Sequence, residues 1–120
     1  NKISNNKPIE VYNNGKMKRD FTYIDDIIDG TISALKENYS CEIFNLGNNK
    51  SENLMDVVSL IEKGLNKKAI INFHPIQPGD VKETFADINH SKEKLNFQPS
   101  TNIDKGIALF IDWFKEYYNV

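Results

Sequence analysis

The sequence lacks several features on which whole classes of protein depend. Cys41 is the single cysteine among the 120 residues, so no disulfide can form within the chain, and this usage is typical of a reducing compartment. No apolar run approaches the roughly 20 residues that a membrane-spanning helix needs, and no signal-peptide pattern opens the chain. We therefore expect a cytoplasmic protein without a membrane partner.

An excess of charge of one sign is also missing. Fifteen Lys and Arg residues against seventeen Asp and Glu residues give a formal net charge of −2, so no global field attracts nucleic acid. His74 and His90 have no partners at metal-ligand spacing. Asp25, Asp26 and Asp29 fall where aspartates offset the dipole of a helix N-terminus. The sequence therefore predicts neither a nucleic-acid partner nor a metal site.

Motifs for cofactor binding and covalent chemistry are absent as well. The chain contains no glycine-rich phosphate loop of the Gly-x-Gly-x-x-Gly type, no Tyr-x-x-x-Lys pair, no nucleophile elbow and no Walker sequence. Nothing among these residues performs hydride or covalent chemistry unaided. We expect no catalytic and no cofactor-binding residue in the chain, which leaves binding as its function.

The residues that are present suit one globular unit. Apolar residues make up 39% and aromatic residues 11% of the chain, which favours an ordered protein. A chain of this length forms one domain or one lobe of a larger domain. We treat residues 1–120 as a single lobe. The first seven residues are mostly polar and carry no start signal, which predicts further chain upstream.

Hydrophobic periodicity predicts short strands that alternate with helices. Strands are expected at 8–12, 21–23, 42–47 and 69–73, with a hairpin turn or a tight loop at 13–15. Helices are expected from Ile24, over 54–65, over 89–95 and over 103–118, the last opened by a capping box of Thr101 and Asp104. This order indicates an α/β lobe, a small sheet with flanking helices, whose wide apolar faces need a partner.

Two places in this lobe carry side chains suited to binding. Arg19 lies between a turn and a predicted strand, and its planar guanidinium suits bidentate contact with phosphate or carboxylate. From residue type alone, a surface ion pair with Asp20 or Asp25 is the favoured interpretation of Arg19. The second place is the loop from Gln77 to Asp80, where an aspartate can accept hydrogen bonds from sugar hydroxyls. An ordinary turn in which Asp80 binds its own backbone is the alternative.

Three runs then occur in order: RDFTYIDD at 19–26, IFNLG at 43–47 and QPGDV at 77–81. In this order and spacing they resemble the RDFxYxxD signature, a buried strand and the substrate loop of extended short-chain dehydrogenase/reductases that act on nucleotide sugars. The similarity continues collinearly from Ile9 to Tyr118, and within that family it is greatest to the UDP-glucuronate 4-epimerases.

The resemblance implies an architecture and a reaction. The chain would be the C-terminal substrate-binding lobe of an extended Rossmann-type (NAD-dependent epimerase/dehydratase) fold. An N-terminal domain outside residues 1–120 would hold NAD and the catalytic groups. The whole protein, a homodimer, would interconvert UDP-glucuronate and UDP-galacturonate through a 4-keto intermediate, because the bound cofactor removes and returns a hydride at C4.

The resemblance also implies a role for five residues of this chain. Arg19 corresponds to the arginine that contacts the diphosphate of the UDP-sugar. Val11 and Tyr12 correspond to the strand along the uracil, largely through main chain, and Asp80 to the carboxylate near the ribose. Gln77 stands where related epimerases often carry a second phosphate-binding arginine. Because the amide is neutral, Arg19 would supply more of the charge neutralisation.

Other interpretations remain open at this stage. A UDP-glucuronate decarboxylase or a nucleotide-sugar dehydratase would share this lobe and differ in catalytic residues outside it. A standalone, non-enzymatic α/β binding module is a third possibility, because Arg19 and its neighbours alone do not exclude it.

Overall fold

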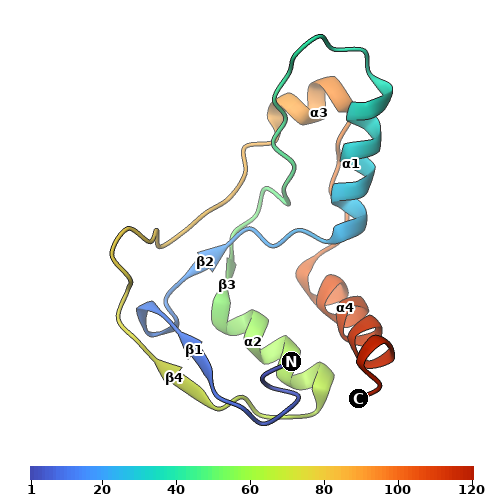
Figure 1. Cartoon of the computed structure of the whole chain (residues 1–120). Helices are drawn as coiled ribbons and strands as arrows, with labels where there is room; N and C mark the ends of the chain where they lie inside the picture. Colours follow the sequence, from blue (N-terminus) through green and yellow to red (C-terminus); the bar gives the residue numbers. More distant parts are fainter.

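The computed structural model describes all 120 residues as four helices and four short strands (Figure 1). In chain order they are β1 (Ile9–Val11), β2 (Lys18–Arg19), α1 (Ile24–Lys36), β3 (Glu52–Asn53), α2 (Leu54–Leu65), β4 (Ile71–Phe73), α3 (Asn89–Leu95) and α4 (Ile103–Tyr118). The predicted α/β class is confirmed, because small sheets are flanked by helices.

The strands form two separate two-stranded sheets. β1 pairs with β4 in parallel, with Val11 opposite Phe73, and β2 pairs with β3 in antiparallel register. Of the two forms predicted for residues 13–15, the hairpin between β1 and β2 is wrong and the tight loop is confirmed. Asn13, Asn14 and Gly15 all have positive φ (50°, 49° and 78°). A two-residue hairpin turn uses two such residues. Here all three form a 3-10 turn, and β2 then pairs with β3 rather than with β1.

The strand predicted over 42–47 does not form. This segment keeps the alternation of a strand: Phe44 and Leu46 pack against the core cluster, whereas Ile43 is 84% exposed. Its backbone finds no neighbouring strand within the chain, and a sheet needs such pairing. The segment predicted as a strand over 21–23 is also unpaired, and β2 lies just before it.

The helices follow their predicted periodicity closely, with one correction at the start of α4. Asn102 caps this helix, because its Oδ1 accepts a hydrogen bond from the Lys105 N–H at 2.9 Å. The capping box predicted from Thr101 and Asp104 is wrong. The Thr101 N–H instead donates to the Asp26 carboxylate at 3.1 Å, which holds Thr101 outside the helix.

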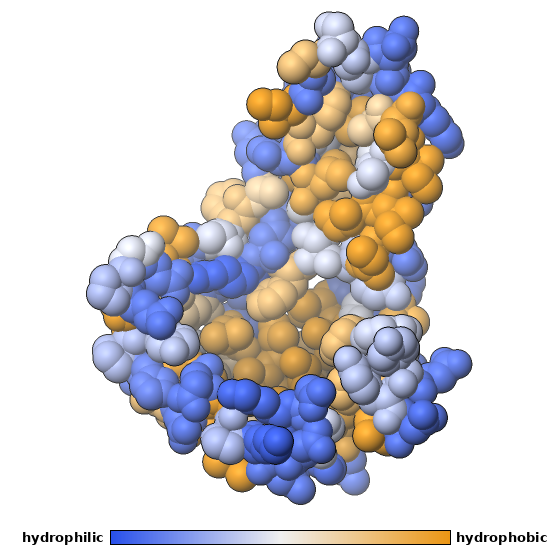
Figure 2. Space-filling model, viewed as in Figure 1, coloured by the Kyte–Doolittle hydropathy of each residue, from blue (hydrophilic) through white to orange (hydrophobic).

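The packed core is small for a chain of this length. Ile88, Leu95 and Phe97 form its buried cluster, and α2 packs against α4 elsewhere. In Figure 1, α1 and α3 form one end, the sheets and α2 the other, and residues 74–88 run along the outside between them. Figure 2 shows hydrophobic residues over α1 and in the hollow between the ends. No helix has the length and apolar composition needed to cross a membrane.

Candidate functional site

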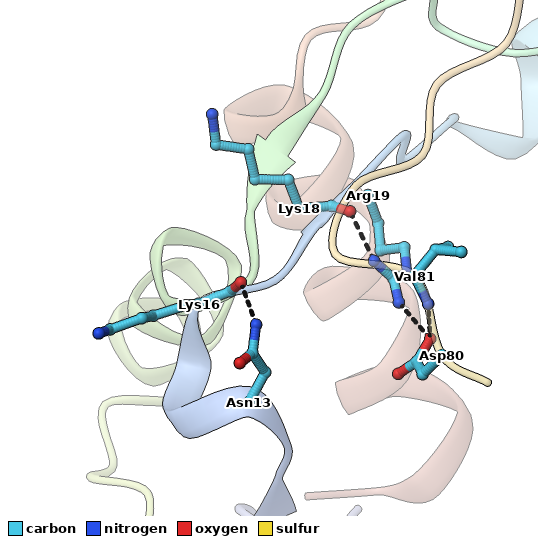
Figure 3. Close-up of polar contacts among 6 residues, drawn as sticks. All are labelled: Asn13, Lys16, Lys18, Arg19, Asp80 and Val81. Atoms are coloured by element: carbon cyan, nitrogen blue, oxygen red, sulfur yellow. Dashed lines mark hydrogen bonds and ion pairs between the residues drawn. The ribbon is translucent and has the colours of Figure 1, made fainter. Parts of the chain in front are cut away.

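The structure brings two of the predicted binding residues into direct contact. Arg19 lies in β2, and its Nη2 donates to Asp80 Oδ1 at 2.9 Å across 61 positions of sequence (Figure 3). Its Nη1 donates to the Lys18 carbonyl at 2.8 Å. The guanidinium and the carboxylate are 28% and 32% exposed. Asp20 and Asp25, the partners considered from sequence, do not pair with Arg19.

A tight turn presents Asp80 to this arginine. The Asp80 N–H donates to the Gln77 carbonyl at 3.1 Å, and Gly79 between them has a φ of +82°, which favours glycine. Asp80 Oδ1 also accepts from the Val81 N–H at 2.9 Å. The turn interpretation of Asp80 is therefore confirmed, because its carboxylate binds the local backbone. The carboxylate also faces the arginine, a contact that the sequence did not predict. The Gln77 side chain is exposed and makes no hydrogen bond within the chain.

Val11 and Tyr12 lie at the carboxyl end of β1, beside the start of the same loop. Val11 is buried, and its carbonyl accepts from the His74 N–H at 2.8 Å. The Tyr12 and His74 rings are 5.4 Å apart. The strands β1 and β4 are parallel, so their carboxyl ends meet at one edge, and the loop to Gln77 and Asp80 leaves from that edge.

Sequence reasoning missed Asp20 as an organising residue. Its carboxylate accepts hydrogen bonds from the backbone N–H groups of Asn48, Asn49 and Ala86 at 2.8, 3.0 and 3.0 Å. The RDFTYIDD run indicates Arg19 as a binding residue, but it gives no indication of the donors to Asp20, which lie 28 to 66 positions away in the sequence. No local pattern could have predicted these contacts.

Asp26 is a second carboxylate whose role the sequence did not predict. It is buried, and it accepts from the Ser100 and Thr101 N–H groups, each at 3.1 Å. Burial raises the pKa of Asp26, but these hydrogen bonds outweigh it and hold the pKa below the ordinary value. Asp26 therefore ties α1 to the segment that precedes α4, in addition to lying in the first turn of α1.

The arrangement around Arg19 suits an anion and not covalent chemistry. Its two hydrogen bonds leave three of the five guanidinium N–H groups for a ligand. In Figure 3 the neighbouring Lys18 side chain points away from Asp80. No group of three or more His, Cys, Asp or Glu side chains could hold a metal ion.

A large apolar cavity lies away from Arg19. Its volume is about 720 Å³, and it lies where the start of α1 faces α2 and α4. Among the residues that line it are Tyr23, Ile24, Val57, Ile61, Ile107 and Trp113. We call it the apolar cleft. It offers few polar groups, so its chemistry suits hydrophobic side chains better than a charged nucleotide.

Comparisons with known proteins give consistent matches along nearly the whole chain. The sequence model of the GDP-mannose 4,6 dehydratase family matches residues 1–110. An uncharacterised protein of Methanocaldococcus jannaschii is 51% identical over 110 residues, which are 92% of this chain and 34% of that protein. The UDP-glucuronate 4-epimerase of Thermodesulfobacterium geofontis is 41% identical over 118 residues, covering 95% of this chain and 35% of that enzyme.

A solved structure matches in three dimensions as well. The UDP-glucuronic acid 4-epimerase of Bacillus cereus, in complex with UDP-glucuronic acid and NAD, superposes with a TM-score of 0.85 at 34% identity, covering 98% of this chain and 38% of that chain. This chain therefore spans little more than a third of the length of the relatives that it matches, and it corresponds to their C-terminal part.

Proposed function

The chain belongs to the GDP-mannose 4,6 dehydratase family, and from that premise we propose that it is the nucleotide-binding lobe of an NAD-dependent UDP-glucuronate 4-epimerase. Such an enzyme interconverts UDP-glucuronate and UDP-galacturonate through a 4-keto intermediate. The contact between Arg19 and Asp80 carries the proposal, because it places an anion-binding guanidinium beside a hydroxyl-binding carboxylate. The similarity to epimerases named for UDP-glucuronate supports it.

The proposed binding mode assigns one part of the nucleotide to each residue. The free N–H groups of Arg19 bind the diphosphate, and Asp80 accepts from the ribose hydroxyls. The uracil lies along Val11 and Tyr12, whose carbonyls each accept one hydrogen bond within the chain and keep a second lone pair. Gln77 lies three residues before Asp80 and adds a neutral amide to the diphosphate end. Contacts of this kind hold the nucleotide and leave the sugar free to turn.

NAD is the cofactor of the family, as its solved members show, but the residues of this chain do not fit it. A dinucleotide pyrophosphate is held by a glycine-rich turn between a strand and a helix N-terminus. The one helix that directly follows a strand here is α2, and Glu52 and Asn53 precede it without a glycine. We therefore derive no reaction step through NAD from these residues, and we propose that an N-terminal domain of the longer protein binds it.

The exposed apolar faces support the proposal of a longer, two-domain protein. Ile24 is 58% exposed, and much of the hydrophobic stripe of α1 is also open to solvent. Exposed hydrophobic patches of this kind mark surfaces that another domain covers. We propose that the cofactor-binding domain packs on the apolar cleft and on α1, and that the complete enzyme is a homodimer in the cytoplasm.

A nucleotide-sugar dehydratase is the second candidate, because the family sequence model is named for one. A product assay separates the reactions. Incubation of the full-length protein with UDP-glucuronate should give UDP-galacturonate with no loss of mass. Release of CO2 would instead identify a decarboxylase, and loss of water a dehydratase.

Substitution of Arg19 in the full-length protein tests the binding mode. Arg19→Ala should raise the Kd for UDP by about 10- to 100-fold, because a charge-assisted contact to the diphosphate is lost. Bound NAD should remain at the wild-type level. Calorimetry with UDP and the absorbance of released nucleotide measure the two quantities.

Lys18→Ala is the matched control, because it removes the same charge from the adjacent residue, whose side chain points away from Asp80 (Figure 3). It should change the Kd for UDP by less than about threefold. An unchanged affinity in Arg19→Ala, or an equal loss in Lys18→Ala, would contradict the assignment of Arg19.

A further inference from the structure

The carboxylate of Asp20 is saturated with hydrogen bonds from separate segments of the chain. Oδ1 accepts from the Asn48 N–H at 2.8 Å and from the Thr22 hydroxyl at 3.3 Å. Oδ2 accepts from the Asn49 N–H and from the Ala86 N–H, each at 3.0 Å. Asp20 follows Arg19 directly, but none of these contacts involves Arg19 or Asp80. The carboxylate therefore organises the backbone around the site without entering it.

The contact with Ala86 continues a ladder of hydrogen bonds beside β2. The Lys18 N–H donates to the Lys82 carbonyl at 2.9 Å, and the Thr84 N–H donates to the Lys18 carbonyl at 3.2 Å. In a regular parallel ladder the next N–H, that of Ala86, would donate to the main-chain carbonyl of Asp20. It donates to the Asp20 side chain instead. The Asp20 side chain thus takes the place of that carbonyl and holds the end of residues 82–86 beside β2.

Close packing leaves this arrangement little freedom. A Cβ on Gly47 would lie 2.5 Å from the Ala86 Cβ and 2.9 Å from Asp20 Oδ2. The backbone of 47–49, the side chain of Asp20 and the backbone at Ala86 are therefore in direct contact. The carboxylate contacts the segment 82–86 through the Ala86 N–H, and Asp80 lies two residues before that segment.

We propose that Asp20 is a positioning residue for the nucleotide site: by holding residues 82–86 against β2, it sets the place at which Asp80 meets Arg19. Its effect on a nucleotide rests on the proposed function, whereas its effect on residues 82–86 does not. Positioning of this kind matters because binding groups act together only when their geometry is held to within about 1 Å.

Asp20→Asn in the full-length protein is the decisive variant. It keeps the volume of the side chain but removes the negative charge that strengthens all four hydrogen bonds, and it turns an NH2 group toward one pair of donors. One pair of hydrogen bonds is therefore lost and the other is weakened. Amide hydrogen exchange should rise at 82–86 and at Asn48 and Asn49, and the Kd for UDP should rise about tenfold. Bound NAD should be unchanged. Asp87→Asn is the matched control, because the Asp87 carboxylate binds the Asn89 N–H and none of the residues of β2.

A double-mutant cycle separates positioning from a general loss of structure. In the Arg19→Ala background, the effect of Asp20→Asn on the Kd for UDP should fall below about twofold, because the group being positioned is gone. A penalty as large as in the wild-type background would overturn the proposal. Unchanged exchange at 82–86 in Asp20→Asn would overturn it as well.

Two further outcomes are also decisive. If Asp20→Asn loses NAD and fails to fold, Asp20→Glu replaces it, because glutamate keeps the charge and displaces the carboxylate by one methylene. Asp20→Glu should retain NAD and still weaken UDP binding. A wild-type affinity for UDP in Asp20→Glu would refute the proposal. Should the wild-type protein not bind UDP, the proposed function fails. The exchange experiment then still tests the positioning of residues 82–86 by itself.

Discussion

Asp26 shows how one side chain can join distant parts of this chain. The lowered pKa of its carboxyl determines the direction in which the stability of the fold changes with pH. Because the folded-state pKa lies below the ordinary value of 3.8, the ionised carboxylate stabilises the fold above that pH. The stabilisation is lost as the pH falls through the lower folded-state pKa. The contact between α1 and the start of α4 should therefore weaken in acid.

Asp26→Asn should lower the free energy of unfolding of the full-length protein by about 2 kcal/mol at pH 7, because hydrogen bonds to a charged acceptor are lost. The difference from wild type should shrink as the pH falls below about 4. Urea denaturation at several pH values measures it. Asp25→Asn, an exposed neighbour in the same turn, should have a much smaller effect, and a pH-independent difference for Asp26→Asn would contradict this account.

Residue types predicted the site only in part. Arg19 and Asp80 were candidates from their chemistry and their motifs, and the structure brings them into contact. Val11, Tyr12 and Gln77 remain predictions drawn from resemblance. Asp20 and Asp26 were missed because a carboxylate gains an organising role only from its donors, and those donors lie far away in sequence.

At the scale of the elements, two helix glycines differ in their surroundings. A Cβ on Gly30 of α1 would lie 2.8 Å from both Leu46 Cδ2 and Phe97 Cδ2. Phe97 is a buried ring that cannot move away cheaply. A Cβ on Gly106 of α4 would meet Tyr23 at an ordinary distance of 3.5 Å. The absence of a side chain at Gly30 therefore lets Leu46 and Phe97 lie close to α1, whereas no residue lies that close to Gly106.

Gly30→Ala should destabilise the full-length protein by about 1 to 3 kcal/mol, because an overpacked core must shift. Gly106→Ala is the matched comparison and should have a much smaller effect, because the neighbours of Gly106 within this lobe lie at ordinary contact distance and alanine favours a helix interior over glycine. Thermal denaturation gives both values. Equal effects of the two substitutions would contradict the packing seen here.

The elements also show where sequence patterns stop being sufficient. The bounds of α1 and α3 follow from periodicity, since each helix makes its hydrogen bonds within itself. The segment 42–47 has the pattern of a strand, but a strand needs a partner, and none is available within the chain. The strand pairing of β1 with β4, rather than with β2, likewise depended on residues some 60 positions away.

The molecule as a whole is open and flat. Its radius of gyration is 16.7 Å and its extents are 48 × 37 × 19 Å, whereas a compact chain of this length has a radius near about 14 Å. The accessible surface is 8255 Å², which exceeds the roughly 6,600 Å² of a compact monomer of the same mass. The excess is larger than the surface that one partner buries in an ordinary interface, which supports packing against another domain.

Ile24→Glu tests this packing in the full-length protein. An acidic residue is favoured in the first turn of α1 by the helix dipole, so the helix itself loses nothing by the change. If a second domain covers the cleft, the buried charge should destabilise the protein by more than about 3 kcal/mol. Thermal denaturation measures the effect, and Asp25→Glu is the neutral control. Wild-type stability in Ile24→Glu would show that the cleft is not covered.

The sequence by itself determined the helices, the α/β class and the family, because these depend on local periodicity and on motifs in a fixed order. It also identified Arg19 and Asp80 as separate candidates. Only the tertiary structure decided that they meet, that Asp20 holds residues 82–86 and that Asp26 ties α1 to α4. Each of these contacts joins residues more than 60 positions apart, and the sequence contains no local signal for where a folded chain returns to itself.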